Sequence, residues 1–295
     1  MNCRKPFNRF GCGQCMPCRI NRRRIWSHRI LLEAHNHENN SFLTLTYSDE
    51  QVPQGNSLQP RDVQLFLKRL RKAISPQSVR YFVVGEYGDT TQRPHYHAAL
   101  FGVGQSHSGL VEETWGKGHI MLGDLTLESA NYIAGYVTKK MTSWFDPRLA
   151  GRHPEFSRMS LRPGIGADYI PAVAKTILSE TRITDAIIAD GDIPSSLKHG
   201  RKTLPLGRYL KGKLYENLGF EQSSDSLIVP VWKEEISRTR AEKKSLELQA
   251  MQEAYKDNSE SAHKPFSEFL RESTQQKILN TEARFKHFNS NKGTL

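Results

Sequence analysis

Residues 41–123 show a hydrophobic pattern that changes repeatedly between the period of a strand and the period of a helix. The segment 41–47 (SFLTLTY) alternates and is rich in β-branched and aromatic residues, which predicts a strand. From Val63 to Ile74, apolar residues recur every three or four positions, which predicts an amphipathic helix. The segments 79–87 and 94–102 have strand composition and are separated by a polar turn, so we expect a β-hairpin.

A helix near 109–115 and a strand near 118–123 complete the order β-α-β-β-α-β. This order predicts an α+β fold of the ferredoxin-like (split βαβ) type, an antiparallel sheet with helices on one face. A further helix, at about 127–141, is expected to pack near the sheet. Residues 145–166 are rich in Pro, Gly and Arg and are expected to form a loop, whereas 169–190 has helical character.

The remaining parts of the chain differ from this central region in composition. The segment Lys198–Lys213 is strongly basic, and residues 232–285 are polar and charged, as expected for exposed helix or disorder. The expected organisation is a Cys-rich basic N-terminal segment (1–35), a central α+β domain (36–166), a basic accessory region (167–230) and a charged helical or partly disordered tail (231–295).

The excess of basic side chains constrains the partners of the chain. Lysine and arginine number 42 against 31 aspartate and glutamate residues, and the isoelectric point is about 9.5. This excess favours a polyanionic partner, and nucleic acid is the leading candidate. The mean hydropathy is −0.60 and no apolar run reaches the roughly 18 residues of a membrane span, so neither a membrane partner nor secretion is expected. All four cysteines lie within the first 18 residues, too clustered to staple the fold, which favours a reducing compartment.

His95 and His97 lie two residues apart in a predicted strand, so their side chains are expected on the same face. A hairpin turn before them would bring Glu86 of the preceding strand beside this pair. Two imidazoles and one carboxylate leave coordination positions open and accept Mg²⁺ or Mn²⁺, of which Mn²⁺ suits imidazole better. The alternative is that the two histidines are merely solvated, because the same spacing recurs by chance at His35 and His37.

Tyr132 and Tyr136 lie four residues apart in the predicted helix 127–141, which places both hydroxyls on one helix face. A phenol with a pKa of about 10 is a weak nucleophile at neutral pH, so a covalent role needs a nearby cation. Lys139 and Lys140 supply that charge one turn further along the chain. The alternative is that both tyrosines are core residues, and the helix considered alone favours it.

The cysteines form a second candidate metal site. Cys12, Cys15 and Cys18 follow a C-x-x-C-x-x-C spacing, and Cys3 would complete a four-thiolate site for structural Zn²⁺. An iron–sulfur cluster also uses closely spaced thiolates, and reduced cysteines without a metal are the third alternative.

A basic cluster directly follows the cysteines. Its side chains are expected to contact DNA phosphates, with Trp26 stacking on a base, and a solvated helix face is the alternative. The segment Lys198–Lys213 offers the same choice, and net basicity favours DNA contact there. The cluster consists of Arg19, Arg22, Arg23 and Arg24.

Three motifs occur in order along the chain, FLTLTY at 42–47, PHYH at 94–97 and YIAGYVTKK at 132–140. Together they resemble the HUH endonuclease superfamily. The paired tyrosines, the flanking VVGEYG and RPHYHAALFG, and the N-terminal CGQCMPCR are similar to replication initiators of gokushovirus-type microviruses, which are small single-stranded DNA phages. The resemblance covers roughly residues 1–166 and implies that 36–166 is an HUH endonuclease domain.

The resemblance implies a role for each motif and a reaction for the whole. The implied reaction nicks single-stranded DNA at an origin through a 5′-phosphotyrosine intermediate and later rejoins the strand in rolling-circle replication. Its implied setting is the cytoplasm of a bacterial host, with the viral origin strand, a host helicase and a polymerase as partners. The implied roles are metal ligand for His95, His97 and Glu86, nucleophile for Tyr132 and Tyr136, charge stabilisation for Lys139 and DNA contact for Lys140.

Two other functions fit parts of this pattern. A relaxase or transposase of the same superfamily would use the same chemistry without this dependence on an origin. A non-catalytic, zinc-containing DNA-binding protein would use the histidines and tyrosines structurally and would form no covalent adduct. The sequence contains no P-loop motif GxxxxGK[ST], so ATP-driven strand separation is expected to come from a partner.

Overall fold

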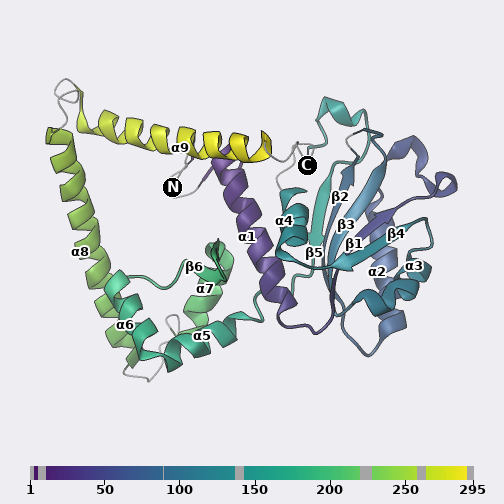
Figure 1. The fold of residues 1–295 in the computed structure, drawn as a ribbon, viewed down its shortest axis with the longest axis horizontal. Coiled ribbons are helices and arrows are strands. Elements are labelled where there is room, and N and C mark those ends of the chain that lie inside the picture. Colours follow the sequence, from purple (N-terminus) through teal and green to yellow (C-terminus); the bar gives the residue numbers. More distant parts are fainter. Residues whose placement is uncertain are drawn as a thin grey trace. The chain divides into compact units, whose positions relative to one another are not determined.

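The structure is a computed structural model and describes residues 3–5, 11–88, 90–136, 143–219, 228–257 and 264–290 (Figure 1). The chain divides into two compact units, each of which combines segments that are far apart in the sequence. The sheet unit comprises Arg23–Ala172 and Ser196–Lys213, and the helical unit comprises Met1–Arg22, Val173–Ser195 and Leu214–Leu295.

The sheet unit contains a five-stranded antiparallel sheet with the strand order β4-β1-β3-β2-β5 (Figure 1). The strand order β4-β1-β3-β2 is that of a split βαβ fold, so the predicted α+β fold is confirmed. The strands are β1 (Asn40–Thr46), β2 (Arg80–Tyr87), β3 (Pro94–Phe101), β4 (Ile120–Asp124) and β5 (Phe156–Met159).

The edge strand β5 lies within residues 145–166, which were predicted to form a loop. Four residues are too few to show a strand period, and the Pro and Gly residues around them are typical of loops. Gly85 permits the pairing of β2 with β5, because a β-carbon there would lie 2.6 Å from the Phe156 ring. The prediction of a loop was therefore wrong for the residues of β5.

One face of the sheet is covered by the two helices of the split βαβ pattern, α2 (Pro60–Ile74) and α3 (Ser108–Trp115). The helix α2 begins with a proline at its first turn, where the missing N–H costs no hydrogen bond. Phe66 and Leu70 of α2 pack with Trp115 over the sheet in the larger of the two described cores. The Trp115 indole N–H donates to the Thr46 carbonyl at 2.9 Å, which satisfies the polar atom of a fully buried side chain.

The opposite face carries α4 (Leu127–Tyr136) and the part of α1 (Met16–Ala34) that belongs to the sheet unit. Ile30 of α1 and Ile133 of α4 pack with Phe82 of β2 in a second core. Helices of the split βαβ pattern thus share one face, as predicted, and two helices outside that pattern cover the other. The candidate site lies on this second face.

A small hairpin of the accessory region is also part of the sheet unit. It consists of β6 (Ser196–His199) and β7 (Lys202–Pro205), and α7 (Gly207–Asn217) follows it. The hairpin is docked on α1, because His28 Nδ1 lies 2.8 Å from the Pro205 carbonyl. The basic segment 198–213 is therefore folded structure rather than a linker.

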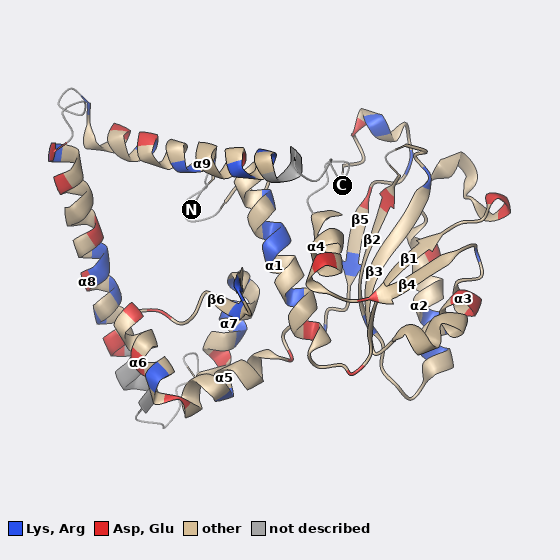
Figure 2. Cartoon of the chain, viewed as in Figure 1, with Lys and Arg blue, Asp and Glu red and all other residues tan. Residues whose placement is uncertain are grey.

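The helical unit contains most of the remaining helices. Residues 169–190 form helices, as predicted, and residues 232–285 lie in helices whose described side chains are mostly exposed. Figure 2 shows Lys or Arg and Asp or Glu side chains interspersed along α8 and α9. Within the described residues, no helix is both long and apolar enough to span a membrane. The helices are α5 (Ile170–Ser179), α6 (Thr181–Asp190), α8 (Ile228–Asp257) and α9 (Phe266–Ser290).

Candidate metal and tyrosine site

The hairpin of β2 and β3 brings Glu86, His95 and His97 together. Glu86 pairs directly with His95 across the two strands, and paired residues project from the same face of a sheet. His97 lies two residues further on and shares that face. The Oε1 atom of Glu86 lies 2.8 Å from His95 Nε2 and 3.1 Å from His97 Nε2. The structure therefore brings together the three residues predicted from the sequence.

Both imidazoles are oriented by a second contact at their other nitrogen. His95 Nδ1 lies 3.2 Å from the Arg93 carbonyl, and His97 Nδ1 lies 2.9 Å from the Thr44 hydroxyl. A carbonyl only accepts hydrogen bonds, so the His95 proton belongs on Nδ1 and the lone pair on Nε2. Partners of this kind typically fix the ligating nitrogen of a metal-bound histidine. No sequence signal pointed to Thr44, because its role depends on contact between strands.

The burial and donor set of this cluster fit a divalent cation. Glu86 is 3% exposed and His97 is 5% exposed, whereas His95 is half-buried. A buried carboxylate is costly unless a cation or hydrogen-bond donors compensate its charge. One donor atom from each of the three residues lies within 4.8 Å of the others, so one ion can bind to all of them. Two nitrogens and one carboxylate oxygen are suitable for Mn²⁺ or Mg²⁺.

The two tyrosines of α4 lie directly against this cluster. The Tyr136 ring stacks on His97 with centroids 5.3 Å apart and planes 12° from parallel. The Tyr132 ring meets His97 edge-on at 5.1 Å and Tyr136 at 4.9 Å. Tyr132 is 47% exposed, while Tyr136 is half-buried. One phenol is thus open to solvent and the other lies deeper, beside the candidate metal ligands.

Burial raises the pKa of the Tyr136 phenol, and the neighbouring Tyr132 and Glu86 raise it further. The carboxylate of Glu86 disfavours a second negative charge next to it. Tyr136 is therefore protonated at neutral pH as long as no cation offsets these effects.

The position of α4 is fixed from α1. The Arg23 guanidinium donates from Nε to the backbone carbonyl of Asn131 at 2.9 Å. The Ser27 hydroxyl lies 2.8 Å from the side-chain oxygen of the same asparagine. Both contacts are one residue before Tyr132. Ser27 and Asn131 were not singled out from the sequence, because only the packing of α1 on α4 gives them this position.

The other predicted DNA contacts have varied surroundings. Arg22 and Arg24 are exposed and Arg19 is half-buried, and Figure 2 shows several basic residues along α1. Trp26, predicted to stack on a base, instead packs on Phe82 at 5.0 Å between ring centroids. Lys139 and Lys140 lie outside the described residues.

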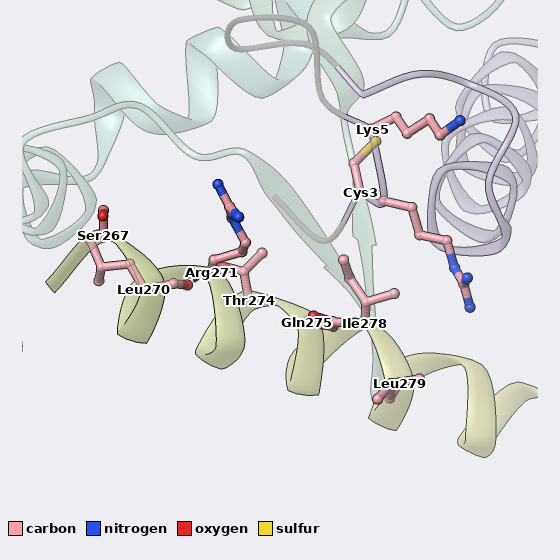
Figure 3. Close-up of a pocket in the computed structure, with 10 residues that line it drawn as sticks. Cys3, Lys5, Ser267, Leu270, Arg271, Thr274, Gln275, Ile278 and Leu279 are labelled. Carbon is pink, nitrogen blue, oxygen red and sulfur yellow. Dashed lines mark hydrogen bonds between the residues drawn. The ribbon is translucent and has the colours of Figure 1, made fainter. Parts of the chain in front are cut away.

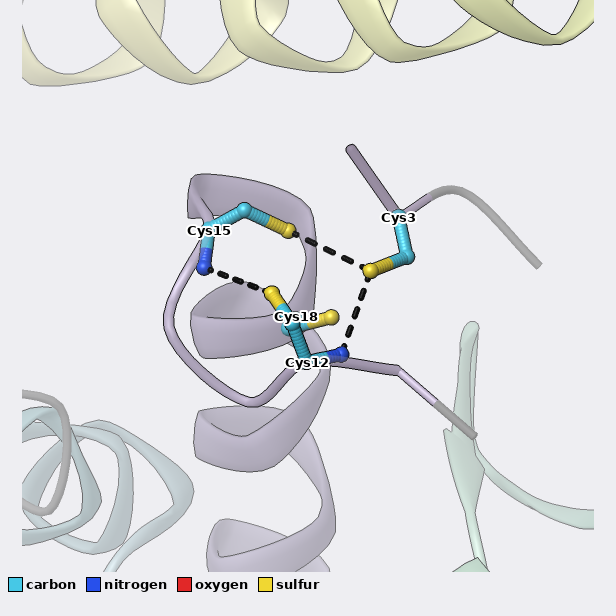
Figure 4. Close-up of side chains that lie close together, drawn as sticks. All are labelled: Cys3, Cys12, Cys15 and Cys18. Atoms are coloured by element: carbon cyan, nitrogen blue, oxygen red, sulfur yellow. Dashed lines mark hydrogen bonds between the residues drawn. The ribbon is translucent and has the colours of Figure 1, made fainter. Parts of the chain in front are cut away.

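The four cysteines meet in a separate cluster of the helical unit (Figure 4). All four sulfur atoms lie within 4.8 Å of one another, and each cysteine is free of a disulfide. Cys3 is buried, and Cys12, Cys15 and Cys18 are half-buried. The structure thus brings the predicted thiolate set together, at the beginning of α1.

The fold and the site indicate a protein of DNA replication, and sequence comparisons give the particular family. Residues 40–141 match the family model of the ORF2-type replication-associated protein. This range includes all five residues of the metal and tyrosine site. The predicted resemblance to replication initiators of small phages is therefore confirmed.

Similar proteins include the replication-associated proteins of three viruses. The chain is 37% identical to replication-associated protein VP4 of Bdellovibrio phage phiMH2K, over 63% of this chain and 65% of that protein. It is 34% identical to replication-associated protein ORF2 of Spiroplasma virus 4, over 58% of this chain and 60% of that protein. It is also 26% identical to replication-associated protein ORF4 of Chlamydia phage 1, over 58% of this chain and 48% of that protein. The chain thus spans less than two thirds of each of these relatives, and no solved structure matches it.

Proposed function

We propose that this protein is a replication-initiation endonuclease that nicks single-stranded DNA at an origin and becomes covalently attached to the cut strand. One observation carries the proposal: both tyrosine rings of α4 contact His97, whose Nε2 lies beside Glu86 in a three-residue cluster suited to a divalent cation. Nucleophile and candidate metal ligands are thus neighbours on one face of the sheet. The similarity to phage replication-associated proteins supports a role in replication.

The residues of the chain divide the chemistry among them. Glu86, His95 and His97 hold Mn²⁺ or Mg²⁺, which supplies positive charge to a phosphate oxygen when bound. The phenol oxygen of a tyrosine forms a bond to phosphorus, the bond to O3′ breaks, and the phenol proton ends on the released 3′-hydroxyl. The product is a 5′-phosphotyrosine, whose phosphodiester retains the free energy needed for rejoining.

Two tyrosines suit a cycle of two cleavages. Tyr132, which is more exposed, is positioned to meet an incoming strand, and Tyr136 lies closer to Glu86. After one round of synthesis the free tyrosine attacks the regenerated origin. The 3′-hydroxyl released in that step attacks the first phosphotyrosine, which closes a circle and frees the first phenol.

Basic side chains supply the remaining contacts with DNA. Lys139 stabilises charge on the phosphate or the phenolate, at the spacing Tyr-x-x-Lys of the resembled superfamily. Phosphate contacts from the other side chains position the strand without reading its sequence. A host helicase and a polymerase complete the reaction in the bacterial cytoplasm. The proposed DNA contacts are Arg19, Arg22, Arg23, Arg24 and Lys140.

The test is formation of a protein–DNA adduct that resists denaturation. Labelled oligonucleotides that tile the single-stranded genome encoding this chain are incubated with the protein and Mn²⁺, and adducts are separated on a denaturing gel. Tyr132→Phe and Tyr136→Phe together should abolish the adduct, whereas Tyr169→Phe, whose ring stacks on His35, should retain it. An adduct from the double variant would refute the assignment of the nucleophiles. The absence of any adduct from the unmodified chain would favour a non-catalytic DNA-binding protein.

A further inference from the structure

The four cysteines at the start of the chain have the spacing of ligands around one ion. Cys15 Sγ lies 3.9 Å from Cys3 Sγ, and all four sulfurs lie within 4.8 Å of one another (Figure 4). Zinc binds thiolates at about 2.3 Å in a tetrahedron, which places the sulfurs about 3.8 Å apart. The observed arrangement is therefore close to that of a single tetrahedral ion.

Other uses of these cysteines fit the geometry less well. A disulfide requires sulfurs about 2.0 Å apart, and none of the four is in one. A cluster of several irons attaches its cysteines to different metal atoms, which spreads the sulfurs further apart than one ion does. Cys3 is only 2% exposed, so it is poorly placed to act as a reactive surface thiol.

The backbone around the cysteines favours the thiolate form that a metal requires. The Cys12 amide donates to Cys3 Sγ at 3.1 Å, and the Cys15 amide donates to Cys12 Sγ at 3.3 Å. Cys15 directly precedes α1, and Cys18 lies in its first turn, where the helix dipole favours negative charge. These features stabilise thiolates independently of the metal and tyrosine site.

The same N-terminal segment lies against α9 within the helical unit. Arg4, next to Cys3, donates from Nε to Glu282 Oε1 of α9 at 2.8 Å. A cavity of about 720 Å³ lies between Cys3, Arg4 and Lys5 on one side and α9 on the other (Figure 3). The α9 residues that line it recur along one helix face and include Leu270, Thr274 and Ile278.

We propose that Cys3, Cys12, Cys15 and Cys18 bind one Zn²⁺ ion and that this ion anchors the N-terminal segment to α9. Residues 3–5 have too little chain around them to bury a core of their own. Bonding of Cys3 to an ion held by Cys12, Cys15 and Cys18 fixes the segment, and Arg4 then meets Glu282. The proposal does not depend on the nuclease activity.

The first measurement is metal content. The full chain, purified under reducing conditions, should contain about one zinc per chain by elemental analysis, and substitution by Co²⁺ should give the absorption bands of a tetrahedral thiolate site. Cys3→Ser and Cys12→Ser should lower the zinc content, whereas Gln14→Ala, an exposed residue of the same loop, should not. His95→Ala should also leave zinc unchanged, because it alters the other candidate site. A chain free of zinc, or one that contains iron with inorganic sulfide, would overturn the identity of the ion.

The second measurement is hydrogen exchange in α9. Removal of zinc from the unmodified chain with a chelator should accelerate amide exchange in α9 by about tenfold or more, while β1 to β3 stay protected. Arg4→Gln keeps all four thiols, so it should retain zinc and still accelerate exchange in α9. Unchanged exchange in α9 after zinc removal would overturn the anchoring role, even if the ion is present.

Discussion

The Tyr136 ring lies stacked on the imidazole of His97, with centroids 5.3 Å apart and planes 12° from parallel. The contact places the phenol beside the candidate metal ligands, and it also buries the phenol and raises its pKa. A cation at Glu86, His95 and His97 would reverse this effect, because it would offset both the desolvation and the carboxylate charge. The geometry therefore makes the reactivity of Tyr136 dependent on the metal.

The first prediction concerns the hydroxyl that orients His97. Thr44→Val keeps the shape of the side chain but removes the partner of Nδ1, so Mn²⁺ binding should weaken by about 10- to 100-fold. Adduct formation should recover at saturating Mn²⁺. Isothermal titration with Mn²⁺ gives the affinity. The matched control is Thr46→Val on the same strand, whose hydroxyl bonds to the His119 carbonyl rather than to an imidazole. Equal Mn²⁺ affinity in the two variants would contradict the orienting role.

The second prediction concerns the tip of the β6–β7 hairpin. Arg201 and Lys202 are exposed there, and Lys202 Nζ lies 3.8 Å from Glu128, one helical turn before Tyr132. If DNA passes over Tyr132, Arg201→Ala with Lys202→Ala should weaken binding of all oligonucleotides alike. The plot of log affinity against log salt should become shallower by about 0.7 per lost phosphate contact.

The control for this prediction removes two charges from the other face of the sheet. Lys68 and Lys72 are exposed on α2, and their replacement by alanine should leave the salt slope unchanged. Fluorescence anisotropy at several salt concentrations measures both variants. If both pairs change the slope equally, binding depends on net charge and not on the hairpin.

The sequence predicted the parts of this fold that depend on local periodicity. The split βαβ order was predicted because each strand and helix has enough residues to show its own period. Glu86 was placed beside His95 and His97 because a hairpin turn determines which residues face each other across two strands. Local spacing likewise grouped the tyrosines of α4.

The parts that the sequence did not reveal depend on contacts between distant segments. The docking of the β6–β7 hairpin on α1 joins His28 to Pro205, and no local pattern records that contact. The roles of Thr44 and Ser27 also arise only once their partners are packed against them. Strand β5 was missed because it is short and acquires its strand character by pairing with β2.

The third prediction concerns the attachment of α4 to α1. Arg23→Met keeps the aliphatic stem but removes the donor to the Asn131 carbonyl, so we expect a loss of about 1–3 kcal/mol in the free energy of unfolding. The rate of adduct formation should fall at saturating DNA, because Tyr132 follows Asn131 directly. Arg22→Met, which removes an exposed charge, should instead weaken DNA binding and leave the saturated rate unchanged. Single-turnover kinetics separate the two effects, and a pure binding defect in Arg23→Met would show that Arg23 contacts DNA.

The fourth prediction concerns the pH dependence of stability. Burial lowers the pKa of His28 from 6.5 to about 4, and the His199 imidazole, with Nε2 atoms 2.9 Å apart, opposes a second charge. Since the unfolded chain binds a proton below pH 6.5 and the folded chain does not, the free energy of unfolding should fall as pH drops from 6.5 to 4. The loss attributable to His28 should total about 3 kcal/mol.

Urea unfolding at pH values between about 7 and about 4.5 measures this dependence. His28→Asn keeps a donor for the Pro205 carbonyl but does not titrate, so its stability should depend less on pH than that of the unmodified chain. His119→Asn, at an exposed position, should retain the full dependence. Burial also lowers the pKa of His199, and His35 lowers it further, so His199→Asn should remove a part of the dependence as well. Parallel curves for His28→Asn and the unmodified chain would show that His28 binds its proton equally well in the folded and the unfolded state.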